Sequence, residues 1–196
     1  MREKRKRTRS IPIVVLSALI CVLTAAETTG IDPALMAKAK AGNAGAEVAV
    51  GVCYADGKGV ARDPQKAVEW YSKAAAQGYI PGEIHLAVLY RDGDGKSFPR
   101  DMQKAAEWYR KAADQGDPGA QGTLGMLYTL GQGVPQNDVE AYFWLDLAAS
   151  VPSANQPQYL INRQNVGARI TADQLADVQD RVAKWQAAHP EKDASK

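Results

Sequence analysis

Few residues in this chain have the types and spacing that catalysis or metal binding requires. His85 and His189 are its two histidines, and neither has a Cys, Asp or Glu at metal-ligand spacing on its predicted helix. No Ser-x-x-Lys, His-Glu-x-x-His or Gly-x-Ser-x-Gly motif is present in the sequence. We therefore expect a protein that is not an enzyme, with no catalytic residue, no metal site and no cofactor.

The segment Asp92-Gly93-Asp94-Gly95 alternates acidic residues with glycines, as calcium-binding loops do. An EF-hand loop needs further oxygen ligands at its fifth, seventh and twelfth positions. The fifth position here is Lys96, whose positive charge opposes cation binding. The segment is better interpreted as a tight polar loop.

The first 26 residues have the pattern of a targeting segment. The basic start MREKRKRTRS precedes an apolar run over residues 11–26, and Thr24-Ala25-Ala26 offers small residues for cleavage after Ala26. That run of 16 residues is shorter than the roughly 20 residues needed to span a bilayer. We expect a cleaved signal peptide and a periplasmic or secreted protein; an uncleaved N-terminal anchor is the alternative.

Charge is distributed unevenly along the chain. Residues 1–26 contain six of the 24 basic residues and one of the 22 acidic residues, so the remainder carries a formal net charge of −3. Such a remainder has no general attraction for nucleic acid or for anionic membranes. It also contains one cysteine, Cys53, which has no partner for an intramolecular disulfide. Cys53 lies in an apolar helical pattern, so we expect a buried, inert thiol.

One ten-residue phrase recurs along the chain. Residues 69–78 read EWYSKAAAQG, residues 107–116 read EWYRKAADQG, and residues 143–152 read FWLDLAASVP. In the first copy, small and large apolar residues follow a helical period that places them on one stripe: Ala67, Trp70, Tyr71, Ala74 and Ala75. One helix cannot bury such a stripe alone, but several helices stacked in a row can.

A second motif, ending in a tyrosine, precedes each copy of the phrase. Tyr54, Tyr90 and Tyr128 are separated by 36 and 38 residues, whereas the tryptophans of the phrase are separated by 38 and 36. This swap places a two-residue insertion in the loop of residues 94–99. Each unit is therefore predicted to contain a first helix that ends near the tyrosine (helix A), a glycine-containing loop, and a second helix that carries the phrase (helix B).

Local signals mark where helices begin and where they approach one another. An Asp-Pro pair, which suits a helix start, begins at Asp32, at Asp63 and at Asp117. A glycine or alanine stands three residues before each tyrosine of helix A. Because glycine costs about 1 kcal/mol against alanine inside a helix, its presence there predicts close contact with another helix.

The third unit departs from the first two. Phe143 and Leu147 stand where the first two units have a glutamate and a lysine, so a face expected to be exposed becomes apolar. The following segment, residues 156–170 and a last helix from Thr171, is predicted to cover that face. Thr171-Ala172-Asp173-Gln174 fits a capping box at the start of this last helix. We therefore expect a helical cap, as solenoids need at their ends.

The combination of LG-x-x-Y, G-x-GV and WY-x-KAA-x-QG at this spacing resembles the Sel-one-like repeats (SLR), which are relatives of the tetratricopeptide repeat. The resemblance covers about residues 44–150, and the second unit departs from it where Lys96-Ser97-Phe98 replaces the expected GV. It implies an all-α, right-handed superhelical solenoid that acts as a protein-binding scaffold in signalling or envelope processes. Exported bacterial members of the family include regulators and host-interaction factors. Some cysteine-rich relatives are linked to β-lactam or peptidoglycan binding, but this chain lacks their helix-linking cysteine pairs.

The predicted organisation combines these observations. It comprises a signal peptide or anchor (1–26), a leading helix (27–43), three repeats (44–79, 80–116 and 117–152), and cap helices with a charged tail (153–196). The predicted function is a non-catalytic scaffold, in the envelope or outside the cell, whose partner is another protein or peptide. We expect no nucleic-acid partner, and no stable membrane insertion if the leader is cleaved. A cell-wall or β-lactam-binding enzyme and a membrane-tethered regulator are the alternatives.

Helix A is expected to line the concave surface, as the resemblance to tetratricopeptide repeats implies. The positions of helix A outside its packing stripe differ between the units, and several are apolar, which favours a peptide or helix as ligand. These candidate binding residues are Val48, Ala49 and Val52, then Ile84, His85 and Val88, then Gly122, Thr123 and Met126. The alternative is that they fill the inside of a tightly curved stack.

Overall fold

The computed structural model describes residues 30–190, and within that range it contains helices and no strand. The helices are α2 (Pro33–Lys40), α3 (Ala44–Asp56), α4 (Pro64–Ala76), α5 (Ile80–Asp92), α6 (Met102–Asp114), α7 (Pro118–Leu130), α8 (Asp138–Ser150), α9 (Gln156–Gly167) and α10 (Ala172–Ala188). The predicted leader of residues 1–26 and the predicted tail of residues 191–196 lie outside the described residues. None of the helices in the described part is long and apolar enough to cross a membrane.

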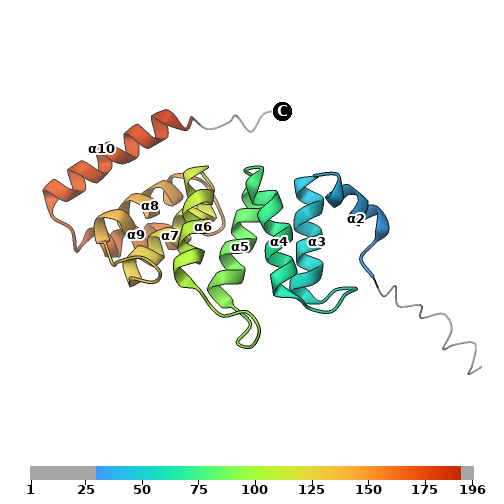
Figure 1. The fold of residues 1–196 in the computed structure, drawn as a ribbon. Helices are drawn as coiled ribbons and strands as arrows, with labels where there is room; N and C mark the ends of the chain where they lie inside the picture. Colours follow the sequence, from blue (N-terminus) through green and yellow to red (C-terminus); the bar gives the residue numbers. More distant parts are fainter. Residues whose placement is uncertain (1–29, 191–196) are drawn as a thin grey trace, which may run out of the picture.

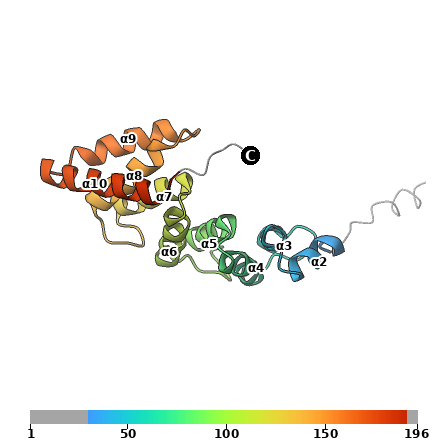
Figure 2. The same ribbon diagram turned by 90° about the horizontal axis from the view of Figure 1, so that it is seen from above.

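Successive helices from α3 to α8 pack against their neighbours in a row of helix pairs (Figure 1). The pairs α3–α4, α5–α6 and α7–α8 correspond to the three predicted units, each with a helix A followed by a helix B. The view from above shows that the row is not straight but bends toward its C-terminal end (Figure 2). The prediction of an all-α repeat solenoid is confirmed.

The predicted helix starts are confirmed. The side chains of Asp32, Asp63 and Asp117 accept hydrogen bonds from the backbone N–H groups of their helices' first turns, and the following proline begins each helix. Helices α3 and α7 end at Gly57 and Gly131, both in the left-handed conformation that glycine adopts without strain.

The predicted insertion is also confirmed. The loops between helix A and helix B cover residues 57–63 in repeat 1, 93–101 in repeat 2 and 131–137 in repeat 3, so the second loop is two residues longer. Since α5 and α6 are as long as their counterparts, the loop absorbs the extra residues and the helices keep their register.

Small residues bring the helices of a pair close together, as expected. A Cβ atom built on Gly51 of α3 would lie 2.5 Å from Cε1 of Tyr71 in α4. A Cβ atom on Gly125 of α7 would lie 2.7 Å from Cγ of Leu145 in α8. Neither position can accept a larger residue unless the paired helix moves.

The tryptophans of the first two repeats are less buried than their place in the helical stripe predicts. Tyr71, Ala67, Ala74 and Ala75 are buried in α4, but Trp70 is half-buried, and so is Trp108 in α6. A lysine one turn away lies over the face of each ring, with Lys73 Nζ 3.9 Å from the Trp70 ring centre and Lys111 Nζ 3.7 Å from that of Trp108.

Trp144, the tryptophan of the third repeat, is 2% exposed. Arg110 of α6 lies over it, with Cζ 5.3 Å from the ring centre, and Phe143 packs edge-on at 4.9 Å. Ser72 occupies the position of Arg110 in the preceding repeat, and its side chain is too short to cover Trp108 in the same way. The burial of this tryptophan therefore depends on the neighbouring repeat.

The C-terminal cap is confirmed. Phe143 is 6% exposed and Leu147 is 1% exposed, and both α9 and α10 pack against their helix α8. Thr171 and Gln174 form the expected capping box at the start of α10. Helix α9 contacts α7 and α8 in the way that α5 contacts α3 and α4, so it stands where the helix A of a fourth repeat would. Helix α10 crosses back over α8 (Figure 1).

Candidate functional site

The candidate residues of the first two repeats lie on the helices A, α3 and α5. Ala49, Val52, Ile84, His85 and Val88 are half-buried, so each has part of its surface available to a ligand. Val48 is a correction: it is 9% exposed and belongs to a packed cluster with residues of α4 and α5. Its burial in this cluster leaves Val48 little surface for a ligand and favours a packing role.

Three of the candidate residues meet at a hollow of about 240 Å³ between α3 and α5. Val52, His85 and Val88 line it, together with Asp56 and Arg62 at its charged edge. We call this hollow the A-helix hollow. It combines an apolar floor with a charged edge, which suits a peptide better than a small ion.

His85 is held in the A-helix hollow as a flat, uncharged ring. It stacks on Tyr71 with 4.9 Å between ring centres and 13° between ring planes. Burial lowers the pKa of His85, while the negative charge of Asp56 acts in the opposite direction and is the smaller effect. His85 is therefore neutral at pH 7 and offers a stacking face and ring nitrogens to a ligand, without a positive charge.

The cap contacts two of the candidate residues of the third repeat, Gly122 and Met126. Tyr159 of α9 lies directly against Gly122, and Asn162 Nδ2 donates a hydrogen bond to Met126 Sδ at 3.0 Å. Thr123 is half-buried, and its hydroxyl donates to Gly119 O at 2.8 Å. Gly122 is thus buried beneath the cap, whereas Thr123 and Met126 are half-buried like the candidates of the first two repeats.

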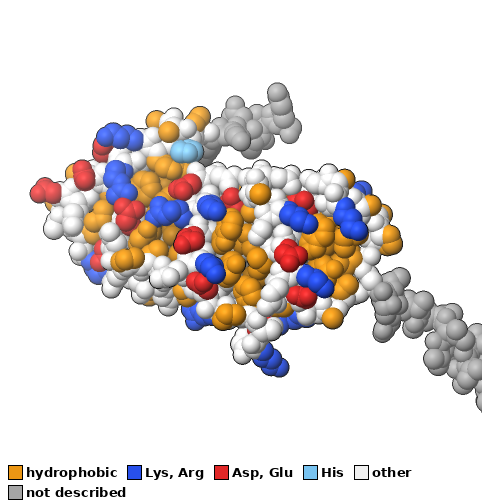
Figure 3. All heavy atoms as spheres, viewed as in Figure 1, with side chains coloured by type: hydrophobic (Ala, Val, Ile, Leu, Met, Phe, Trp, Pro, Cys, Tyr) orange, Lys and Arg blue, Asp and Glu red, His pale blue; other side chains and the backbone are white. Residues whose placement is uncertain are grey.

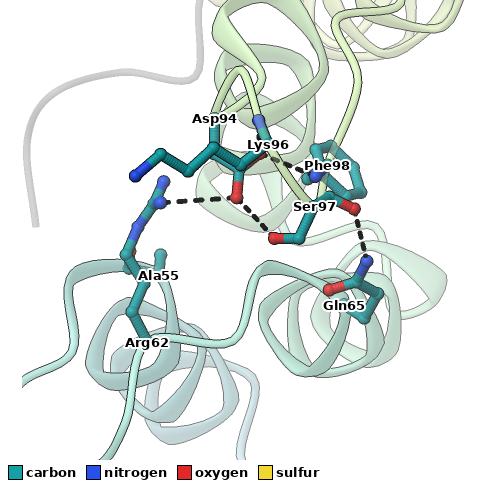
Figure 4. Close-up of polar contacts among 7 residues, drawn as sticks. All are labelled: Ala55, Arg62, Gln65, Asp94, Lys96, Ser97 and Phe98. Carbon is teal, nitrogen blue, oxygen red and sulfur yellow. Dashed lines mark hydrogen bonds and ion pairs between the residues drawn. The ribbon is translucent and has the colours of Figure 1, made fainter.

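Asp94, the central residue of the acidic-glycine segment, is used to shape its own loop (Figure 4). Its Oδ1 accepts hydrogen bonds from the backbone N–H groups of Lys96 at 2.8 Å and Phe98 at 2.7 Å, and its Oδ2 accepts from Ser97 Oγ at 2.6 Å. These bonds hold the pKa of Asp94 well below its usual range. Among residues 30–190, no group of three or more potential ligand side chains is arranged to hold a metal ion.

The same loop joins the first repeat to the second. Arg62 Nη1 lies 3.5 Å from Asp94 Oδ2, and Gln65 Nε2 donates to Ser97 O at 2.9 Å (Figure 4). Both Arg62 and Gln65 belong to repeat 1, so the longer loop of repeat 2 packs back onto the preceding repeat.

A larger cavity, of about 920 Å³, lies between the end of the solenoid and α10, and the sequence did not predict it. We call it the cap cavity. Its lining includes Ile80, Gln121, Leu147, Val151, Trp185 and His189. A sequence signal that could have indicated it is the loss of the Gln-Gly ending at the third copy of the repeated phrase, where Val151-Pro152 stands instead.

Two further residues, Cys53 and His189, have side chains of the kind used in catalysis. Cys53 is half-buried, which corrects the expectation of a fully buried thiol. His189 stacks on Trp185 with 4.1 Å between ring centres, and its Nδ1 lies 2.9 Å from Trp185 O. Neither has a partner arrangement of the kind that nucleophilic or acid-base catalysis requires.

The surface between these sites is mixed. Figure 3 shows hydrophobic side chains gathered in separate patches along the row of helices, with basic and acidic side chains between them. Repeating patches of this kind suit contact with an extended partner.

Antiparallel helix pairs stacked in a row define an α-solenoid. The family model described as the Sel1 repeat matches residues 44–79, 81–117 and 118–150. The chain belongs to the Sel1 repeat family, which confirms the resemblance found in the sequence.

One similar solved structure supports the same fold. A Sel1 repeat protein from Oxalobacter formigenes is similar at 28% identity with a TM-score of 0.56, over 65% of this chain and 95% of that chain. A protective antigen with an SLR fold from uropathogenic Escherichia coli matches at 24% identity and a TM-score of 0.43, over 79% of this chain and 48% of that chain. Helicobacter pylori cysteine rich protein B matches at 28% identity and a TM-score of 0.44, over 49% of this chain and 71% of that chain. No curated protein matches the chain.

Proposed function

We propose that this protein is a non-catalytic scaffold that binds another protein through the A-helix hollow, in the cell envelope or outside the cell. Sel1 repeat proteins generally mediate protein–protein interaction, and their fold is generally a non-catalytic scaffold. The observation that carries the proposal for this chain is the meeting of Val52, His85 and Val88 from two successive helices A at one hollow with a charged edge.

The hollow favours a peptide or helix as the bound element. Val52 and Val88 offer apolar contact, the His85 ring offers a stacking face, and Asp56 and Arg62 offer charges of both signs at the edge. An apolar centre with a polar edge is the usual composition of a protein-binding surface. Because the lining comes from two repeats, binding also depends on the stacking of those repeats.

The binding proposal is tested by crosslinking and capture in the native host. We expect the double variant Val52→Glu with His85→Glu to lose its partner, because it places two carboxylates in the apolar part of the hollow. Glu107→Lys, on the exposed side of α6, is the matched charge-changing control and should keep the partner. If circular dichroism shows both variants folded and both capture the partner equally, the A-helix hollow is not the binding site.

The export part of the proposal rests on the basic and apolar pattern of residues 1–26. Mass measurement of the protein from its native host tests it. A chain that begins at Glu27 supports cleavage and release. A chain that retains residues 1–26 supports the membrane-tethered alternative instead.

A further inference from the structure

A partly buried hydrogen bond links the two helices of each of the first two repeats. Gln77 Nε2 at the end of α4 donates to Glu47 Oε2 of α3 at 2.7 Å, and Gln115 Nε2 at the end of α6 donates to Glu83 Oε2 of α5 at 2.7 Å. Both glutamates are 4% exposed. We call this pair the Glu–Gln latch. It shows that a carboxamide N–H fits at the end of helix B, against an acceptor near the start of helix A.

The third repeat has lost the latch. Gln121 stands at the position of Glu47 and Glu83, and Val151 stands at the position of Gln77 and Gln115. Gln121 is 1% exposed, and its Nε2 donates to Ala113 O at 3.2 Å. Its Oε1 has no hydrogen-bond donor within the described part of the chain. A buried acceptor without a donor destabilises the state that contains it, so a ligand that brings a donor is favoured there.

The unpartnered Gln121 lies beside the cap cavity. Gln121 and Val151 both line this cavity, and the C-terminal turns of α10 form its far wall with Trp185 and His189. Trp185 reaches across to the preceding repeat, since its Cη2 would lie 3.6 Å from a Cβ atom on Gly116. At about 920 Å³ the cavity has room for several residues of a peptide.

The charge of the cap cavity is that of Asp114. This residue lines the cavity, has no ion pair within residues 30–190, and is replaced by Ala76 in repeat 1 and Ser150 in repeat 3. Burial raises the pKa of Asp114, while the positive charges of Arg110 and His189 act against that rise. Asp114 is an exposed residue, so a cationic group that enters the cavity can reach its carboxylate and pair with it.

We propose that the cap cavity binds a basic peptide segment of a partner protein. The segment places an amide N–H, from its main chain or from an Asn or Gln side chain, on Gln121 Oε1. Its apolar side chain packs between Leu147 and Trp185, and its Lys or Arg side chain pairs with Asp114. This site is separate from the A-helix hollow, so either site can be shown absent without affecting the other.

The test uses the full chain and an immobilised library of random twelve-residue peptides, followed by calorimetric titration of the selected sequences. We expect selection of peptides that carry Lys or Arg near an apolar residue. Gln121→Leu keeps the volume of the side chain but removes the acceptor, and it should weaken binding of a selected peptide at least tenfold. Gln121→Glu keeps an acceptor and should retain binding within about threefold.

Asp114→Asn tests the charge. It should weaken binding of a selected basic peptide at least fivefold and remove most of its dependence on salt. Glu107→Gln removes a carboxylate from the exposed side of the same helix and should leave binding unchanged. The His85→Glu variant of the A-helix hollow should also bind the peptide normally, which separates the two proposed sites.

Three outcomes would overturn the proposal. The first is that the library yields no binding peptide. The second is that the folded Gln121→Leu and Asp114→Asn variants both bind a selected peptide like the wild type. The third is that peptides bind a chain that ends at Pro190 but not the full chain. That result would mean that residues 191–196 of the chain itself, and not a partner, occupy the cap cavity.

Discussion

The first two repeats and the third share one plan but meet different surroundings. Helices α4 and α6 expose Glu69 and Glu107, whereas the equivalent Phe143 of α8 is 6% exposed beneath the cap. The Glu–Gln latch closes the first two repeats and is absent from the third. A helix pair can therefore be made internal or terminal by changing a few positions while its backbone stays the same.

The difference follows from what lies next to each repeat. Repeats 1 and 2 are each followed by a copy of similar shape, so the same residues can be used again. The third repeat must instead be covered by α9 and α10, which are not copies. Arg181 of α10, for example, places Cζ 4.7 Å above the Phe143 ring while its Nη2 lies 2.7 Å from Glu140 Oε1.

The largest expected effect contrasts the tryptophans of repeats 2 and 3. Trp144→Ala should destabilise the protein by about 3–5 kcal/mol, because it removes a large side chain that is 2% exposed. Trp108→Ala should cost about 1–2 kcal/mol, because part of its ring already contacts water. Urea unfolding at 25 °C measures both. Equal losses would show that the two repeats do not differ in packing at this position.

A smaller effect is expected from adding a methyl group to helix A. Gly122→Ala would drive a Cβ atom into the ring of Tyr159, so α9 must shift, at a cost of about 1–3 kcal/mol. Gly45→Ala of repeat 1 is the matched control, since its nearest contact would be an ordinary 3.5 Å. It should be neutral or stabilise the helix by up to about 1 kcal/mol. A tolerated Gly122→Ala would contradict the close packing of the cap.

The smallest effect concerns the loop that ties repeat 2 to repeat 1. The pKa of Asp94 is lowered in the folded state, so its contribution to stability is complete above the unfolded pKa of about 4 and is lost as the pH falls through the folded value. Asp94→Asn should lower the melting temperature at pH 7 and flatten the loss of stability in acid. Melting curves between pH 2 and 7 measure this, with Asp177→Asn on exposed α10 as control.

Glu83 acts in the opposite sense to Asp94, which must be considered in the same experiment. Burial raises its pKa in the folded state, so its protonation favours folding as the pH falls toward that value. In the wild type, acid should therefore reduce the stabilisation of the fold by Asp94 and relieve the destabilisation by Glu83. If Asp94→Asn leaves the loss of melting temperature in acid unchanged, the Asp94 loop does not stabilise the contact between repeats 1 and 2.

Features that depend on neighbouring residues in the sequence could be predicted. The Asp-Pro helix starts, the two-residue insertion and the capping box at Thr171 all follow from local backbone chemistry, and all three are present. The apolar Phe143 and Leu147 also predicted correctly that another element covers their helix, because an apolar face of this size is unfavourable in water.

Features that depend on contacts between distant segments could not be predicted. Val48 is buried in a cluster with residues of α4 and α5, and Gly122 is covered because Tyr159 of α9 lies on it. The cap cavity exists because α10 turns back over α8 to reach Gly116. A repeat alignment assigns equivalent positions the same role, so it fails where the neighbours of those positions differ.

The reach of Trp185 to Gly116 bears on how proteins of this kind can change length. The cap contacts the turn between repeats 2 and 3, where Gly116 has a counterpart in Gly78 of the turn between repeats 1 and 2. Duplication of repeat 2 would present the cap with the same glycine and the same last repeat. Duplication of residues 80–116 would thus lengthen the solenoid by a whole repeat while residues 117–190 stay as they are.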